Sequence, residues 1–523
     1  MIFTSLKFIE FLVLLFLVYF IVGKVCPKYQ WVLLLGFSIY FYAQAYVKYL
    51  IFLAFSIAST YGAARLIGLC NSKTEEKIRN ISDKEDNYKE KKKSLKKVNE
   101  RNIRIILVMC IVLNIAVLAY VKYVNVFAAR VGKHFDSIIT PLGVSFYTFM
   151  SIGYCIDVCR GIVEPEKNIL KYALYVSYFP HISQGPIGQY EKLAGQFFEK
   201  HDFDYSRFVG GLERILLGFF KKIIVANNLA LVVDRVYDNY TEYTGLSFVF
   251  ATLMYAIQLY ADFSGYMDIA LGASSVLGIT LDENFQTPYF SKNISEYWRR
   301  WHITLGAWFR DYVYYSVLRS KPVSEINKKI RKSSREKKKL VNKLITVGGL
   351  IVTWGCIGFW HGASLNYMGH AMWHAFFIIA AILLEDYYER LRVFFKIKED
   401  SKAFDLFRIL RTFIIVNIGY VMFRADSLRI ALHIYKSIIT DIFGGGFLTL
   451  VGSYEQSFWV TTLFGILVIL FIDIIEVKEN RFTWFNRLPT AVRWIVIYAV
   501  AFIVIINAYE QPVSSGAFLY FDF

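Results

Sequence analysis

Apolar runs that are long enough to cross a lipid bilayer recur along almost the whole chain. A transmembrane helix needs about 20 predominantly apolar residues, and runs near this length lie around residues 8–23, 30–45, 47–68, 104–124, 140–158, 169–188, 208–234, 247–278, 344–360, 367–385, 407–424, 458–476 and 490–508. The runs are continuous rather than alternating, and they are too long for the strands of a membrane barrel. The sequence therefore predicts an all-α fold, a polytopic transmembrane helical bundle of about 11–13 spans and re-entrant segments.

The composition supports a membrane-embedded protein and excludes a string of soluble domains. Of the 523 residues, 56% are hydrophobic and only 19% are charged, and a water-soluble chain could not bury so much apolar surface. Aromatic residues make up 18%, with 10 Trp and 37 Tyr, and both types favour the interface between membrane and water. We therefore expect one membrane-embedded domain over residues 1–523.

Basic residues concentrate in two segments between apolar runs, residues 73–104 and 321–343. The net charge of +17 could indicate nucleic acid, but these residues are not spread over a folded face with aromatic side chains that read bases. The positive-inside rule explains both clusters, so we expect two cytoplasmic loops and no nucleic-acid partner. The apolar run at 8–22 lacks a sizeable basic leader and an Ala-x-Ala cleavage site, which predicts a retained first span.

No group of residues predicts a metal or disulfide site. Cys155 and Cys159 lie one helical turn apart, but small buried cysteines in a membrane helix are the commoner interpretation. His370 and His374, in GHAMWHAFF, have the i, i+4 spacing of a metal-binding pair, yet no carboxylate or third ligand accompanies them. We expect no metal and no permanently bound cofactor.

One histidine lies deep in apolar sequence. His361 follows the run that leaves the basic segment at Lys343, within CIGFWHGASLNY, and ionisable residues inside a membrane are costly and therefore candidates for function. A neutral imidazole accepts the proton of a hydroxyl group that attacks a thioester carbonyl, and Gly362 permits a close approach of substrate or backbone. A buried histidine that stands alone is nevertheless more often structural.

A second histidine adjoins two arginines. His302 lies in EYWRRWHITL, directly after Arg299, Arg300 and Trp301. Two guanidinium groups would suit an anionic donor, such as an acyl thioester that carries phosphates. The alternative is an interfacial anchor, because the surrounding segment 282–318 is too polar for a plain span and too aromatic for an ordinary loop.

Several longer stretches occur in order over about 142–426, and they read SFYTFMSIGYCIDVCRG, YFPHISQGPIGQY, LYADFSGYMDIALGASSVLGI, NFQTPYFSKNISEYWRRWHITLGAWFRDYVY, GFWHGASLNY and GYVMFRADS. Together they resemble the motifs of the membrane-bound O-acyltransferase family, and more narrowly its bacterial branch that contains the alginate O-acetylation membrane protein. The closing GAFLYFDF is also similar to that branch. One departure is visible: Ile182, Ser183 and Gln184 precede GPI, where the family usually has small apolar residues.

The resemblance implies roles for individual residues. His361 falls on the active-site histidine of the family's WHG motif, and His302 falls on the histidine of WRRWH, which lines the same catalytic tunnel in relatives. Arg299, Arg300 and Trp301 are expected to bind the donor. Supporting roles are expected for four further residues of the matching motifs, namely Trp360, Asn366, Asp262 and Tyr266.

The resemblance also implies a function. Relatives imply a helical domain around a catalytic tunnel, with a donor that enters from the cytoplasm and an acceptor that is reached from outside. We expect an O-acyltransferase of the bacterial inner or cytoplasmic membrane that moves acetyl groups from acetyl-CoA for O-acetylation of a cell-surface or exported polysaccharide. The expected protein partner is an extracytoplasmic acyltransferase of the esterase-like type.

Two alternative functions stay open. A sister branch with the same two histidines transfers D-alanine towards teichoic acid from a small carrier protein, and it would need a cytoplasmic docking surface. A non-catalytic transporter would show paired buried charges or pseudo-symmetric broken helices, and neither is visible in the sequence.

Overall fold

The structure is a computed structural model that describes residues 3–45, 47–81, 87–129, 141–398 and 401–510. Nine helical segments of the described chain are long and apolar enough to cross a membrane, and they are Leu6–Val25, Val47–Arg79, Tyr88–Val126, Tyr205–Asp238, Gly245–Val276, Arg335–His361, Lys402–Arg424, Gln456–Lys478 and Thr490–Tyr509. Leu365–Leu383 and Glu385–Phe394, which meet at 67°, make a tenth if they form one broken span. The predicted all-α polytopic membrane fold is confirmed.

The chain divides into two compact units, which are Met1–Leu212 with Ala270–Asp282, and Glu213–Ile269 with Glu283–Phe523. We call them unit 1 and unit 2. The helices α9 (Tyr205–Phe220) and α11 (Gly245–Val276) contribute residues to both. The single domain over residues 1–523 stays a prediction.

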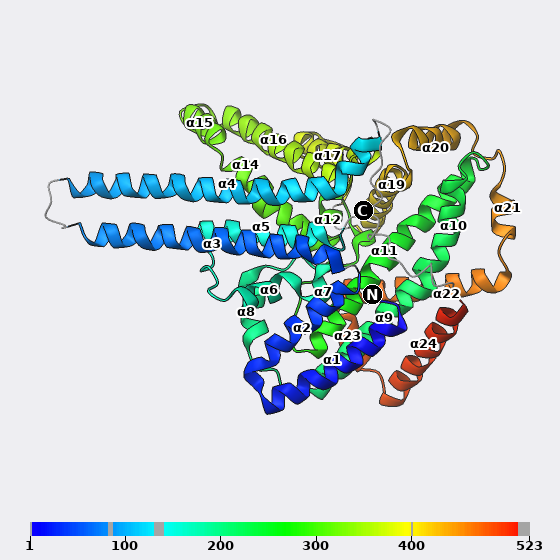
Figure 1. The fold of residues 1–523 in the computed structure, drawn as a ribbon. Helices are drawn as coiled ribbons and strands as arrows, with labels where there is room; N and C mark the ends of the chain where they lie inside the picture. Colours follow the sequence, from blue (N-terminus) through cyan, green and yellow to red (C-terminus); the bar gives the residue numbers. More distant parts are fainter. Residues whose placement is uncertain (1–2, 46, 82–86, 130–140, 399–400, 511–523) are drawn as a thin grey trace. The chain divides into compact units, whose positions relative to one another are not determined.

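Unit 1 contains the N-terminal helices, which are α1 (Leu6–Val25), α2 (Gln30–Ala43), α3 (Leu50–Arg79), α4 (Tyr88–Ala129), α5 (Val144–Arg160), α6 (Ile169–Ser177), α7 (Phe179–Ile182) and α8 (Tyr190–Phe198). The long helices α3 and α4 run side by side (Figure 1). Near their joined ends, Asn99 Nδ2 donates a hydrogen bond of 2.8 Å to Asn71 Oδ1. Both helices combine an apolar stretch long enough to cross a membrane with charged turns where the two helices join.

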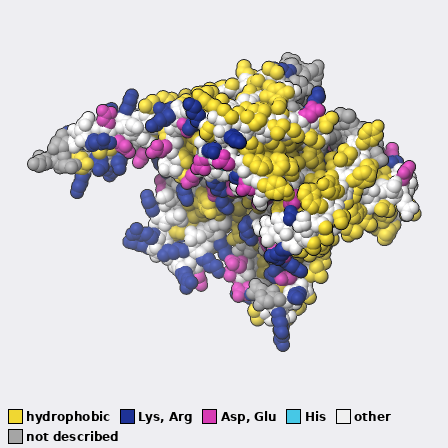
Figure 2. Space-filling view, turned by 90° about the horizontal axis from the view of Figure 1, so that it is seen from below, with side chains coloured by type: hydrophobic (Ala, Val, Ile, Leu, Met, Phe, Trp, Pro, Cys, Tyr) yellow, Lys and Arg dark blue, Asp and Glu magenta, His cyan; other side chains and the backbone are white. Residues whose placement is uncertain are grey.

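Both basic segments, which we expected to form cytoplasmic loops between spans, are largely helical. Residues 73–104 lie mostly on the last turns of α3 and the first turns of α4, and residues 321–343 lie mostly on α15 (Lys321–Ile330) and the start of α16 (Arg335–His361). The physical reason is that Lys, Arg and Glu are good helix formers. Figure 2 shows charged side chains crowded near the joined ends of α3 and α4, and a broad apolar area elsewhere in that view. The cytoplasmic orientation of both segments stays a prediction.

Three predicted spans of unit 1 form helices shorter than a typical span. The runs at 30–45 and 140–158 correspond to α2 with 14 residues and α5 with 17 residues, and residue 140 lies outside the described residues. The run at 169–188 breaks into α6 and α7 at Tyr178, whose ψ of 117° leaves the helical region just before Pro180. We count these helices among the predicted re-entrant segments rather than among the full spans.

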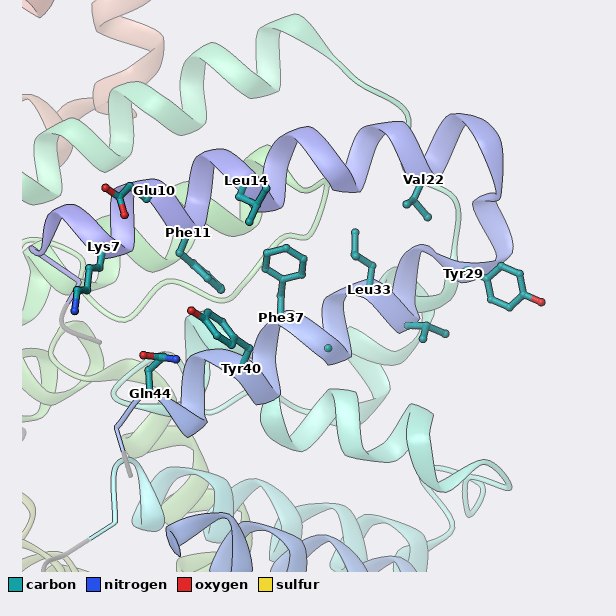
Figure 3. A pocket seen from close by; sticks show the side chains of 12 residues that line it. Lys7, Glu10, Phe11, Leu14, Val22, Tyr29, Leu33, Phe37, Tyr40 and Gln44 are labelled. Atoms are coloured by element: carbon teal, nitrogen blue, oxygen red, sulfur yellow. The ribbon is translucent and has the colours of Figure 1, made fainter. Parts of the chain in front are cut away.

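An open groove of about 940 Å³ lies between α1 and α2. Lys7, Glu10 and Gln44 lie towards one end of it, and Tyr29 lies towards the other (Figure 3). Apolar side chains such as Phe37 line the stretch between these ends. The candidate residues predicted from the sequence do not line this groove.

Unit 2 contains the remaining elements, which are the π-helical turns η3 (Lys221–Ala226) and η5 (Phe309–Tyr314), the 3₁₀ turn η4 (Pro288–Phe290), and the helices α10 (Asn227–Asp238), α12 (Ile294–Arg300), α13 (Ile303–Trp308), α14 (Tyr315–Leu318), α17 (Leu365–Leu383), α18 (Glu385–Phe394), α19 (Lys402–Arg424), α20 (Leu428–Thr440), α21 (Phe447–Gly452), α22 (Gln456–Lys478), α23 (Arg481–Asn486) and α24 (Thr490–Glu510), together with α15 and α16. Helix α17 packs along α16 and α19, and the short α12 contacts α17 and α19. This arrangement positions the candidate site.

Candidate functional site

His361 is the last residue of α16 and is buried, with 6% of its surface exposed. Its ring lies 5.0 Å from the ring of Phe423 and 6.3 Å from that of Tyr367. Gly362 follows it, and a Cβ at Gly362 would lie 2.7 Å from the Tyr367 ring, so the absence of a side chain lets the chain turn tightly against that ring. The glycine therefore permits the close approach that the sequence predicts, although the neighbour is a tyrosine of α17.

His302 is also buried, with 1% exposed, and its backbone lies in the left-handed region at φ 45° and ψ 53°. Thr287 has a φ of 45° as well. Residues other than glycine rarely adopt this conformation, and such strain persists only where the surrounding structure enforces it, frequently at functional sites. The strained backbone at His302 supports a functional rather than an anchoring role for this segment.

Asn284 holds the backbone around His302. Its Oδ1 accepts hydrogen bonds from Thr304 N at 3.0 Å and from Thr304 Oγ1 at 2.8 Å, and it lies 3.4 Å from His302 Nδ1. Its carbonyl oxygen accepts from Ile303 N at 3.0 Å. The sequence analysis missed Asn284, although a buried amide within the motif segment that also holds His302 was a possible signal.

Trp360 lies close to both His302 and His361. Its ring lies 4.5 Å from that of His361 and 6.3 Å from that of His302. The structure therefore brings His302, His361 and Trp360 together within unit 2.

The residues predicted to bind the donor have different environments. Arg299 is exposed. Arg300 is partly buried, and its guanidinium donates to Thr287 Oγ1 at 3.1 Å and pairs with Glu296 at 2.7 Å. Trp301 is buried and stacks on Tyr297 with a centroid distance of 5.7 Å. Of the two arginines, Arg299 has the more exposed side chain.

Asn366 ties the start of α17 to the end of α19. Its Nδ2 donates to the carbonyl oxygens of Met422 at 3.2 Å and Ala425 at 2.7 Å. Its Oδ1 has no hydrogen-bond partner in the part of the chain that the structure describes. These contacts give Asn366 a structural role. That Asn366 also orients His361 or the substrate stays a prediction.

His370 and His374 are buried on α17. His370 Nδ1 lies 2.9 Å from the carbonyl oxygen of Gly419, and the His374 ring stacks on those of Tyr297 and Trp354. The described residues contain no group of three His, Cys, Asp or Glu that could hold a metal ion. The surroundings of these two histidines are therefore mainly aromatic rings.

Asp262 and Tyr266 lie buried on α11, and Asp262 reveals a feature that the sequence analysis missed. Its carboxylate lies 2.6 Å from Lys222 Nζ, and both side chains are at most 4% exposed. Lys221 Nζ lies 2.7 Å from Asp268, again with both side chains at most 3% exposed. Paired buried charges, which we did not see in the sequence, are thus present in the structure. The signal was present in FFKKIIVA, because two adjacent lysines inside an apolar run need partners.

The chain is similar in sequence to several known proteins. Residues 166–423 match the model of the MBOAT, membrane-bound O-acyltransferase family. The chain is 32% identical over 345 residues to a probable alginate O-acetylase of Pseudomonas syringae, which covers 64% of this chain and 60% of that protein. The chain thus spans about 60% of the length of such relatives.

Two further relatives have names that indicate other acceptors. The chain is 29% identical over 470 residues to a peptidoglycan O-acetyltransferase of Helicobacter pylori, which covers 83% of this chain and 79% of that protein. It is 27% identical over 298 residues to a teichoic acid D-alanyltransferase of Bacillus subtilis, which covers 55% and 69%, respectively.

Proposed function

We propose that this chain is a member of the membrane-bound O-acyltransferase family and, within that family, an O-acetyltransferase. It moves acetyl groups from cytoplasmic acetyl-CoA for O-acetylation of a cell-surface or exported polysaccharide. The observation that carries the proposal is the pair of buried histidines, His302 and His361, whose rings both approach Trp360 within unit 2.

His361 acts as the general base in this proposal. Its imidazole takes the proton of an acceptor hydroxyl while the oxygen of that hydroxyl attacks the thioester carbonyl of the donor. The carbon–sulfur bond then breaks, and the leaving CoA thiolate receives the proton from the imidazolium. The rings of Trp360, Tyr367 and Phe423 surround His361 and limit the access of water to the thioester.

Arg299 and Arg300 meet the phosphates of the donor. Guanidinium groups bind phosphate oxygens through short, charge-assisted hydrogen bonds. Arg299 is exposed and able to reach such a ligand, whereas Arg300 also supports Thr287. Acetyl-CoA is therefore a substrate rather than a resident cofactor.

The acceptor lies outside the cytoplasm. The relatives named alginate O-acetylase and peptidoglycan O-acetyltransferase support a polysaccharide acceptor, reached directly or through an extracytoplasmic acyltransferase of the esterase-like type. We assign the chain to the bacterial inner or cytoplasmic membrane on the same grounds.

D-alanyl transfer towards teichoic acid is the second candidate, and the relative from Bacillus subtilis favours it. One experiment separates the two. The purified chain in liposomes is incubated either with acetyl-CoA labelled in the acetyl group or with a carrier protein loaded with labelled D-alanine. We expect release of CoA and consumption of acetyl-CoA that depend on His361. Reaction with the loaded carrier alone would replace acetyl transfer by D-alanyl transfer.

A further inference from the structure

Two adjacent lysines on the π-helical turn η3 reach two carboxylates on α11. Lys222 Nζ lies 2.6 Å from Asp262 Oδ1, and Lys221 Nζ lies 2.7 Å from Asp268 Oδ2. π-Helical turns are rare and are frequent at functional sites. This turn directs consecutive side chains towards carboxylates that lie six positions apart on one helix.

Each of the two carboxylates is next in sequence to a residue that supports His302. Phe263 follows Asp262, and its ring meets the imidazole of His302 edge to face at 4.8 Å. Met267 precedes Asp268, and its sulfur accepts a hydrogen bond of 3.2 Å from Asn284 Nδ2. Asn284 in turn holds the backbone after His302. The two ion pairs therefore act at points on α11 that adjoin its contacts with His302 and Asn284.

Asp268 is the more heavily anchored of the two carboxylates. Besides Lys221, Arg214 Nε lies 3.0 Å from it and Arg481 Nη2 lies 2.7 Å from it. Both arginines come from elements other than η3, namely α9 and α23. The position of α11 is thus tied to several neighbouring elements by charge as well as by packing.

Stability alone is a poor explanation for these pairs. Removing two charges from water is expensive, and well-packed apolar residues often replace a buried ion pair without loss of stability. In some proteins, however, a buried polar or ionic group fixes the register and the partner of a helix.

We propose that Lys221 and Lys222 are positioning residues that hold α11 so that Phe263 and Met267 support His302 in its strained conformation. The proposal rests on the proposed function, because it gives the lysines their effect on acyl transfer through His302. The lysines themselves do not touch the substrate.

The test replaces the simpler pair with apolar residues, Lys222→Met together with Asp262→Leu. We expect normal amounts of protein in the membrane and a loss of acetyl transfer of roughly 10- to 100-fold, because small misplacements of catalytic groups cost this much. The matched control is Arg493→Met with Glu213→Leu, which removes an ion pair of 2.9 Å elsewhere in unit 2 and should leave transfer within about threefold of wild type.

A double-mutant cycle with Phe263→Leu shows whether the pair acts at the His302 contact. Phe263→Leu by itself should lower transfer, and adding the apolar pair should lower it by less than about threefold more, since residues that act through one contact are not additive. Fully multiplicative losses, or an apolar pair with near-normal transfer, would overturn the proposal.

If the apolar pair fails to reach the membrane, Lys222→Arg decides: reduced transfer at normal abundance supports positioning, and wild-type transfer contradicts it. His302→Ala tests the proposed function separately, because normal transfer by that variant would show that the reaction does not need His302.

Discussion

The ring of His302 lies 6.3 Å from the ring of Trp360, which is the residue directly before His361. One indole therefore links two motifs that are far apart in the sequence. Phe263 covers another side of the same imidazole at 4.8 Å. Both histidines thus lie in an aromatic environment, where polar groups interact more strongly than at the surface. In the proposed reaction this environment would protect the thioester from water.

The first prediction concerns His361. His361→Ala should reduce acyl transfer by about 10²–10⁴-fold, because it removes the proton acceptor for hydroxyl attack. His361→Gln keeps much of the size and hydrogen bonding but does not take a proton at neutral pH, so it should be nearly as inactive. Transfer to the surface polymer is measured beside the amount of each variant in the membrane. A structural histidine would give the opposite pattern, with an active His361→Gln and a poorly expressed His361→Ala.

The second prediction concerns the donor. Arg299→Ala should raise the apparent KM for acetyl-CoA by roughly 10-fold with little change in kcat, since an exposed guanidinium that binds phosphate contributes to ground-state and transition-state binding alike. Arg300→Ala should also weaken donor use, and it should lower thermal stability as well, because Arg300 contacts Thr287 and Glu296. A normal KM in both variants would show that the phosphates bind elsewhere.

The third prediction concerns orientation. Ser94 and Ser334 are exposed on the two basic segments, and each is replaced by cysteine in a chain whose six native cysteines have been changed to serine or alanine. An impermeant thiol reagent should label both positions only after the cells are opened, because the positive-inside rule puts these segments in the cytoplasm. Labelling on intact cells would reverse the topology.

Local motifs singled out two histidines that the structure brings close to the same residue, Trp360. His361 and His302 each stand in a short, characteristic sequence, and the apolar runs predicted spans because membrane thickness sets their length. The charged segments were harder, because Lys and Glu are common both in loops and in exposed helices. The break between α6 and α7 had a visible cause in Pro180, but an apolar run alone does not distinguish a span from a broken helix.

The buried ion pairs depended on long-range geometry. Lys222 and Asp262 are distant in sequence, and they meet where the π-helical turn η3 faces α11. Nothing in the spacing of FFKKIIVA and DFSGYMD specifies that register. The same limit applies to Asn284, whose role arises from the left-handed backbone at His302.

The fourth prediction concerns Asn284. Asn284→Leu removes the acceptor for Thr304 N and Thr304 Oγ1, so the turn at His302 should relax and acyl transfer should fall by roughly 10-fold or more. Thr304→Val removes only the hydroxyl donor and should have a smaller effect, on the order of threefold. Equal transfer by Asn284→Leu and wild type, at equal abundance, would mean that the strained turn is not needed for function.

The fifth prediction compares two glycines of unit 1 that share a positive φ. Gly143 has φ 64° and Gly161 has φ 72°, but a Cβ at Gly143 would overlap the carbonyl oxygen of Ile182, whereas nothing lies within 4 Å of a Cβ at Gly161. Gly161→Ala should cost only the backbone strain of a left-handed alanine, about 1–2 kcal/mol. Gly143→Ala adds a clash with a backbone atom at the end of α7 that no side-chain rotation relieves, so the thermal midpoint of the purified protein in detergent should fall clearly further for this variant. Equal midpoints for the two variants would show that the backbone of Gly143 does not pack closely against Ile182.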